Sequence, residues 1–277
     1  MDLTAVANHA QSIRHNIIDM IHEAGSGHPG GSLSAADIMA ALYFGGIVKY
    51  DSTHPDDPDR DRVIMSKGHA APALYATLAE AGYIAKEELK TLRKLGTRLQ
   101  GHPDSNLVPG VEVSTGSLGQ GLSIAAGLAA GLKLDKSSHH VYAVLGDGEC
   151  EEGQVWEAAT FAAFNELNNL IAIVDQNGLQ IDGPVTEVCE VGSLCDKFKA
   201  FGWDVHEVDG HDLQALITTL QACKDTTSTK PQVVIAATIK GKGVSFMENQ
   251  AGWHGKAPND EQTAQALKEI DGGSVRG

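Results

Sequence analysis

The stretch from His140 to Gly183 constrains the fold more than any other part of the sequence. A short apolar run, residues 141–145, ends at a glycine–aspartate turn, and a second apolar run, residues 170–174, ends in Asp-Gln-Asn. A helical segment of about twenty residues is expected between them, which gives a β-α-β unit of the usual size, roughly 30 residues or more. Strand-like and helical patterns alternate elsewhere too. We therefore predict an α/β fold with a mostly parallel sheet and helices on both faces.

Two oxygen-bearing side chains follow the two strands of this unit. Asp147 and Asn177 lie just past the carboxyl ends of the strands, which is where open α/β sheets bind ligands. Carboxylate and amide oxygens suit a hard divalent cation, Mg²⁺ or Ca²⁺, and Mg²⁺ usually retains phosphate ligands. The helix that begins near Glu151 would direct its N-terminus toward such a phosphate group. The sequence therefore predicts a cation beside a diphosphate.

Histidines and lysines in glycine-rich turns form a second group of candidates. Four histidines stand beside glycine: His28, His69, His102 and His254. One such histidine is ordinarily a surface or capping residue, but four of them at predicted strand or helix ends could bind hydroxyl oxygens and transfer protons. Three lysines could neutralise a diphosphate or could simply be solvated: Lys67, Lys240 and Lys256. The remaining histidines, His211 among them, are expected to be structural or solvated.

Composition and motif spacing exclude several functions. The net charge is −15 and no Lys/Arg block interrupts it, so neither nucleic acid nor an anionic membrane is an expected partner. No HxxxH or HExxH spacing occurs, which argues against zinc. Gly25-x-Gly27-x-x-Gly30 matches the dinucleotide fingerprint but follows a helix instead of a strand, so we reject that interpretation. Four cysteines without a disulfide pattern, and no recognisable secretory leader, indicate the cytoplasm.

Several local features complete the expected organisation. We predict one domain over residues 1–277, with helices at 3–24 and 86–94 and a partly helical segment at 187–200. A helix is expected to be capped by Ser34, and residues from about 260 to 277 read as a polar tail.

Seven ordered motifs together resemble one enzyme family. They are GHPGG (27–31), SKGHAAP (66–72), GHPD (101–104), VSTGSLGQGL (113–122), GDGE (146–149), DQNGLQIDG (175–183) and WHGKAP (253–258). GDGE with an asparagine thirty residues after its aspartate is similar to the thiamine-diphosphate motif, and the full set resembles transketolase over about residues 10–260. The resemblance implies the thiamine diphosphate-binding (PP-type) fold of the N-terminal transketolase domain.

The same resemblance implies roles for individual residues. Mg²⁺, with Ca²⁺ or Mn²⁺ as substitutes, would be held by Asp147, Asn177 and the carbonyl of Leu179. Contacts to thiamine diphosphate would come from His69, Gly116, Ser117, Leu118, Gly148, Glu149, Asn177, His254, Lys67 and Lys240. Catalytic, substrate-side histidines would be His28, His102 and His254. Lys256 matches a further lysine of the family.

Members of this family continue for several hundred residues beyond the matched region and there supply a pyrimidine-binding domain with the glutamate that activates the cofactor. The resemblance therefore implies the N-terminal subunit of a split transketolase, a transferase moving a two-carbon ketol unit between sugar phosphates in the pentose phosphate pathway. It would be active only together with a C-terminal subunit, in an assembly of two copies of each chain. Two alternatives stay open: a ketol or acyloin transferase for a sulfo- or branched sugar, and a non-catalytic cofactor-binding subunit.

Overall fold

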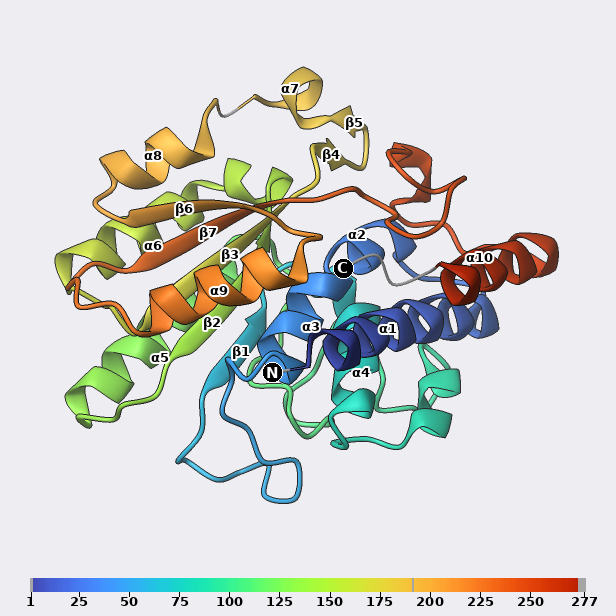
Figure 1. Cartoon of the computed structure of the whole chain (residues 1–277), viewed down its shortest axis with the longest axis horizontal. Helices are drawn as coiled ribbons and strands as arrows, with labels where there is room; N and C mark the ends of the chain where they lie inside the picture. Colours follow the sequence, from blue (N-terminus) through green and yellow to red (C-terminus); the bar gives the residue numbers. More distant parts are fainter. Residues whose placement is uncertain (1, 191, 274–277) are drawn as a thin grey trace.

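The computed structural model of the chain describes residues 2–190 and 192–273. These residues form a five-stranded parallel sheet with strand order β1-β2-β3-β7-β6 (Figure 1). The strands are β1 (Arg62–Met65), β2 (Val141–Gly146), β3 (Leu170–Gln176), β6 (Asp204–Asp209) and β7 (Gln232–Ala237). The three central strands are apolar and buried along almost their whole length, as expected where helices cover both faces of a parallel sheet.

Alternate strand residues enter two separate cores. Tyr142, Val144, Ile171 and Ile173 pack on one face, while their neighbours along the chain pack on the other. The first face is covered by α1 (Leu3–Ala24), α3 (Ala36–Phe44), α4 (Ala71–Glu80) and α9 (Leu213–Lys224). The second is covered by α5 (Gln120–Leu134), α6 (Gly153–Phe164) and α8 (Leu194–Ala200). The predicted α/β class with helices on both faces is confirmed.

Shorter elements surround the carboxyl ends of the strands. They are α2 (Pro29–Ser34), α7 (Val185–Val188), the hairpin of β4 (Leu179–Gln180) and β5 (Gly183–Pro184), and the 3-10 turns η1 (Gly68–Ala70), η2 (Lys86–Thr91), η3 (Gly148–Glu151) and η4 (Ala251–Trp253). None of the helices in the described residues combines the length and the apolar character that a membrane span requires.

Two local predictions were wrong. The helix of about twenty residues between β2 and β3 is instead the turn η3 followed by the twelve-residue α6, because Glu152 is extended (φ −68°, ψ 127°) and separates them. Ser34 caps no helix: it is the last residue of α2, and the N-cap position of α3 is occupied by Ala35, which offers no side-chain cap. The Ser34 hydroxyl instead donates to the carboxylate of Asp175 at 2.5 Å, so a tertiary contact outcompetes the local one.

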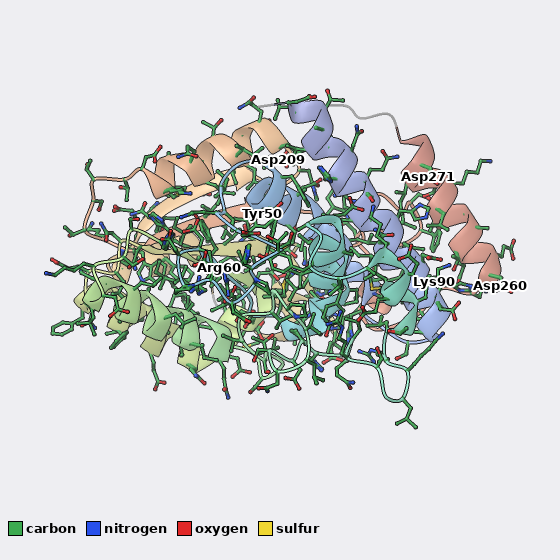
Figure 2. All side chains as sticks on the ribbon, turned by 90° about the horizontal axis from the view of Figure 1, so that it is seen from below. Tyr50, Arg60, Lys90, Asp209, Asp260 and Asp271 are labelled. Carbon is green, nitrogen blue, oxygen red and sulfur yellow. The ribbon has the colours of Figure 1, made fainter. Side chains whose placement is uncertain are left out.

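The outer segments also differ from the sequence expectation. The predicted helix at 86–94 is only the 3-10 turn η2, and the segment 187–200 contains α7 and α8, with Val191 outside the described residues. Residues 260–272 of the predicted polar tail form α10 (Asp260–Gly272), which packs along α1 through buried Ala266 and Ile270. Figure 2 shows Asp260 and Asp271 at opposite ends of this helix. Residues 274–277 of that tail lie outside the described part.

Candidate active site

The carboxyl ends of four neighbouring strands place most of the predicted site residues on one edge of the sheet. Lys67 and His69 follow β1, Asp147 follows β2, Asn177 follows β3 and Lys240 follows β7. In-register pairing of Gly146 with Asp175 puts the residues after β2 and β3 next to each other. The Oδ2 atom of Asp147 accepts a hydrogen bond from the N–H of Gly178 at 2.6 Å. The predicted adjacency of Asp147 and Asn177 is therefore present in the fold.

Asp147 is a buried carboxylate, and no ion pair joins it to another residue within 2–190 or 192–273. Among the described residues, its hydrogen bonds come from the backbone N–H groups of Gly148 (2.8 Å) and Gly178 (2.6 Å). Burial, together with the nearby carboxylate of Asp175, raises the pKa of Asp147 to about 6. A divalent cation beside this group would offset the cost of burying its charge.

Asn177 and Leu179 complete the predicted set of cation ligands. The Oδ1 atom of Asn177 accepts from the N–H of Leu179 at 3.2 Å, so this side chain keeps its oxygen toward the loop. A cavity of about 350 Å³ lies against Asp147, Asn177 and Thr238. Leu179 does not line it, and its carbonyl accepts a hydrogen bond from the ammonium of Lys240 at 2.9 Å. The structure thus brings two of the three predicted ligands to the cavity.

No cluster of three or more His, Cys, Asp or Glu side chains within residues 2–190 and 192–273 is arranged to hold a metal ion. The predicted set is of another kind, because it combines one carboxylate, one amide and one main-chain carbonyl. Such a mixed oxygen set still suits Mg²⁺, which completes its octahedron with water and phosphate oxygens.

A buried ion pair that the sequence analysis missed lies next to this set. The ammonium of Lys67 pairs with Asp175 and also donates to the carbonyl of Gly31 at 2.9 Å. Ser34 and Thr238 donate their hydroxyls to the same carboxylate. Burial acts to raise the pKa of Asp175, but Lys67 and the hydroxyls outweigh it and lower that pKa. An aspartate inside an otherwise apolar strand was the available signal, since such a charge needs a partner.

The lysines therefore differ from one another. Lys67 and Lys240 are each 2% exposed, so the solvated alternative is wrong for both. The ammonium of Lys240 donates to the carbonyl of Leu179 and contacts the Nδ1 atom of His254, each at 2.9 Å. Burial and the charge of Lys67 lower the pKa of Lys240 to about 8. Lys256 is exposed and lies over the ring of Trp253, 5.0 Å from its centroid.

Glu149 holds three loops together. Its carboxylate accepts from the Ser66 hydroxyl at 2.5 Å and from the N–H groups of Gly119 (2.9 Å) and Gly146 (3.0 Å). These bonds occupy both oxygens, so its side chain anchors the loop that carries Gly116 to the ends of β1 and β2. Ser117 and Leu118 of that loop are exposed, and Gly148 lies beside the side chain of Gln180.

Gly116 has a conformation and a neighbour that exclude a side chain. Its φ of +155° is unfavourable for other residues, and a Cβ there would lie 3.0 Å from the ring of His102. On its other side, a Cβ on Gly68 would lie 2.7 Å from the N atom of Gly116. The loop therefore passes between the β1 turn and His102 with no side chain at Gly116. This geometry lets the main chain approach a ligand closely.

Three of the four predicted histidines form a cluster. Ring centroids are 5.3 Å apart for His28 and His69, 5.4 Å for His28 and His254, and 4.9 Å for His69 and His254. His102 is more exposed and lies outside this cluster, beside Gly116. Burial lowers the pKa of every member, with the nearest cation as the second cause: to about 4 in His28, about 2 in His69 and about 3 in His254. All three are therefore neutral imidazoles near pH 7.

Arg93 is a further site residue that the sequence did not reveal. It is a non-glycine residue with φ of +59°, a strained conformation of the kind that collects at functional sites. Its guanidinium donates to the Ser26 hydroxyl at 3.0 Å and to the Nδ1 atom of His28 at 3.3 Å. Because a guanidinium only donates, the Nδ1 atom of His28 is the acceptor and its Nε2 atom carries the proton. The ammonium of Lys240 fixes His254 in the same tautomer.

Comparison with known proteins identifies the family. Residues 6–273 match the family model described as transketolase, thiamine diphosphate binding domain. The chain is 42% identical over 270 residues to a protein from Phocaeicola vulgatus that is named as one subunit of apulose-4-phosphate transketolase, covering 98% of this chain and 95% of that one. It is also 42% identical over 262 residues to 6-deoxy-6-sulfo-D-fructose transketolase subunit SqwG from a Clostridium species, covering 95% and 94%.

Full-length transketolases match over their first part only. Human transketolase is 43% identical over 272 residues, which are 97% of this chain but 42% of the human one. The crystal structure of transketolase from Campylobacter jejuni superposes with a TM-score of 0.92 at 33% identity, covering 98% of this chain and 43% of that one. Transketolase from Leishmania mexicana gives 0.90 at 34% identity, covering 96% and 41%. The chain belongs to the transketolase family, as its thiamine diphosphate-binding domain.

Proposed function

We propose that this member of the transketolase family is the diphosphate-binding subunit of a two-chain transketolase that requires Mg²⁺ and thiamine diphosphate. The observation that carries the proposal is Asp147. It is a buried carboxylate that receives only backbone N–H groups from the part of the chain that the structure describes, it lies against a cavity beside Asn177, and a cluster of neutral histidines occupies the neighbouring loops.

The residues present fit these two groups. Asp147 and the Oδ1 atom of Asn177 are hard oxygen donors beside one cavity. The carbonyl of Leu179 accepts from Lys240 with one lone pair, and its second lone pair would be available to the cation. Burial first, and then the charges of Lys67 and Lys240, lower the pKa values of His69 and His254. A diphosphate is the anion that would balance both the metal and Lys240.

The chain's own groups would then act mainly as hydrogen-bond donors. Bound thiamine diphosphate supplies the nucleophilic carbon that carries the two-carbon ketol unit. The Nε2–H groups of His28 and His254, fixed by Arg93 and Lys240, point away from their cationic partners and would donate to substrate oxygens as negative charge develops there. His102, at the more open side, would contact the sugar. His69, Gly116, Gly148 and the backbone near Ser117 and Leu118 would line the cofactor.

A second chain is part of the proposal. The chain spans nearly all of the relatives named as subunits but about two fifths of full-length transketolases. Large apolar side chains are exposed around the site, with Leu118 36%, Val188 42% and Ile181 67% accessible. Large contiguous apolar patches mark binding surfaces, and we infer that these three side chains belong to such a patch. A C-terminal subunit that carries the activating glutamate would cover them, in an assembly of two copies of each chain.

Sugar phosphates are the proposed substrates, and the pentose phosphate pathway the proposed setting. Two relatives carry names that specify apulose-4-phosphate and 6-deoxy-6-sulfo-D-fructose, so a branched or sulfonated sugar is the second candidate. We further propose a cytoplasmic location, supported by four free cysteines, two of which are buried.

The test is reconstitution. The purified chain is mixed with its C-terminal subunit, Mg²⁺ and thiamine diphosphate, and transfer of a ¹³C-labelled two-carbon unit to an aldose phosphate is followed by NMR. Fructose 6-phosphate, apulose 4-phosphate and 6-deoxy-6-sulfofructose serve as parallel donors. Transfer from the first supports the main proposal, and transfer from only one of the others supports the second candidate. Cofactor binding without transfer from any donor would identify the chain as the non-catalytic cofactor-binding subunit. Light scattering of the mixture tests the two-plus-two assembly.

A further inference from the structure

Lys240 lies near the start of the long connection between β7 and η4, and we call its segment Ile239 to Lys242 the loop. Its side chain is buried and reaches the carbonyl of Leu179 and the ring of His254. Backbone hydrogen bonds hold the centre of the loop: the N–H of Gly241 donates to the carbonyl of Gly30 at 3.0 Å, and the N–H of Asn249 donates to the carbonyl of Lys240 at 2.9 Å. The two ends of the loop, Ile239 and Lys242, are held by contacts from other elements.

A buried carboxylate on another element provides such contacts. Asp37, on α3, is 6% exposed and lies on the face of the sheet covered by α1 and α9. It accepts two hydrogen bonds from the guanidinium of Arg14 on α1, at 2.9 and 2.5 Å. It accepts a third from the Nδ1 atom of His211, at 2.6 Å. Burial alone would raise the pKa of Asp37, yet Arg14 and His211 lower it to about 2.

Both partners of Asp37 also form a hydrogen bond with the loop, one at each of its ends. The Nε atom of Arg14 donates to the carbonyl of Lys242 at 3.2 Å. The backbone N–H of Ile239 donates to the Nε2 atom of His211 at 2.8 Å. Because His211 accepts at Nε2, it must be the neutral tautomer that donates from Nδ1 to Asp37. A single carboxylate is thus connected by two side chains to the residues that flank Lys240 and Gly241.

We propose that Asp37, Arg14 and His211 form a clamp whose role is to position Lys240. These are positioning residues, since they touch neither the cavity beside Asp147 nor the histidine cluster. With both loop ends fixed, the ammonium of Lys240 stays at the carbonyl of Leu179 and the ring of His254. The catalytic consequence of this clamp rests on the proposed function, whereas its effect on the loop does not.

The surroundings of the clamp make selective substitutions practicable. A cavity of about 550 Å³ is lined by Arg14, Asp37, His211 and Lys242, so smaller or altered side chains there do not have to displace a packed core. Figure 2 shows Asp209, which also lines this cavity, near the end of α9 that faces α1.

Two substitutions each remove one of the two hydrogen bonds that connect the clamp to the loop. In His211→Asn, the amide N–H replaces Nδ1–H and keeps Asp37 satisfied, but no acceptor reaches the N–H of Ile239. In Arg14→Lys, the charge beside Asp37 is retained while the donor to Lys242 is lost. His206→Asn is the matched control, because His206 is a partly buried histidine of β6 that contacts Gln232 and not the loop.

The first measurement uses the chain without cofactor or partner. Amide hydrogen exchange of a peptide spanning residues 239–243 should accelerate by about tenfold or more in either variant, while peptides of β2 and β3 keep their protection. Reductive methylation of Lys240, followed by mass spectrometry, should accelerate in parallel. The clamp is overturned if His211→Asn and Arg14→Lys leave this peptide and this lysine as protected as in His206→Asn, or if protection falls equally throughout the chain.

The second measurement uses the complex of both subunits. A misplaced Lys240 should lower kcat by about tenfold to a hundredfold with the sugar KM nearly unchanged, since small displacements in an active site have effects of this size. An unchanged kcat in both His211→Asn and Arg14→Lys would show that the clamp does not serve the reaction. Loss of loop protection in the isolated chain, with no transferase activity in the wild-type complex, would instead count against the proposed function and leave the clamp standing.

Discussion

Two carboxylates one strand apart, Asp147 after β2 and Asp175 within β3, are both buried but have opposite surroundings. Lys67, from the turn after β1, neutralises Asp175, and the hydroxyls of Ser34 and Thr238 donate to the same carboxylate. Asp147 faces the cavity and receives only backbone N–H groups among the described residues. Accordingly the pKa of Asp175 is lowered and that of Asp147 is raised to about 6.

This contrast divides the edge of the sheet into two corners. In one, protein groups neutralise the buried carboxylate; in the other, the buried carboxylate is left to backbone N–H groups. The first corner, around Lys67 and Asp175, holds an ion pair, a further lysine and three neutral histidines, so its charges are already arranged. The second corner, around Asp147, holds a buried carboxylate whose hydrogen bonds come, among the described residues, from backbone N–H groups alone. We interpret the first corner as a preformed scaffold and the second as the place of an external cation.

The largest expected effect tests the first corner. Asp175→Asn leaves the buried ammonium of Lys67 without its counter-ion, so we expect a loss of about 3–5 kcal/mol in the free energy of unfolding. Urea unfolding followed by circular dichroism measures it. The double variant Lys67→Met, Asp175→Asn should recover part of the loss, because no unpaired charge remains. A loss of less than about 1 kcal/mol in the single variant would mean that the pair is not the scaffold described.

A smaller effect concerns the histidines at the same corner. His69 has a folded-state pKa of about 2, below its ordinary value of 6.5, so the unfolded chain binds a proton that the folded chain does not. The contribution of His69 to the free energy of unfolding therefore falls as the pH drops below about 6.5, by about 1.4 kcal/mol per pH unit, until the pH approaches 2. Urea unfolding between pH 7 and pH 5 should show a shallower pH dependence in His69→Gln than in the wild type. Equal slopes would contradict a buried, neutral His69.

The smallest expected effect concerns Arg93. Removing its guanidinium in Arg93→Met takes away the donor to the Nδ1 atom of His28, so both neutral tautomers become available and the pKa of His28 rises. ¹⁵N NMR of labelled histidine, assigned with His28→Asn, distinguishes the two nitrogens. Arg93→Lys is the charge-preserving control. If the wild type already carries its proton on Nδ1, the assignment of His28 as an Nε2–H donor is wrong.

The parts of this arrangement that could be predicted from sequence are those encoded locally. Asp147 and Asn177 directly follow apolar runs, so their position at strand ends was predictable from spacing, and the glycine-rich turns identified the histidines. The functional partners Asp175, Arg93, Asp37 and His211 were not identified, because each depends on contacts between residues 23 to 174 positions apart.

Two predictions failed because the local sequence was misleading. Ser34 has the side chain of a helix cap, yet Asp175, a residue 141 positions away, binds its hydroxyl. Helix α10 appeared as a polar tail because only a narrow stripe containing Ala266 and Ile270 is buried, while its start is fixed by a capping box of Asn259 and Gln262. In both cases tertiary contacts decided between alternatives that local sequence left open.

The central claim is that Asp147 receives a divalent cation that anchors a diphosphate. The most direct test is isothermal titration of the chain with thiamine diphosphate, with and without Mg²⁺, for the wild type and Asp147→Asn. We predict Mg²⁺-dependent binding to the wild type, competition by pyrophosphate but not by thiamine, and no detectable binding to Asp147→Asn. We also predict that this variant unfolds in urea no more easily than the wild type. Mg²⁺-dependent binding of equal affinity in Asp147→Asn would contradict the claim.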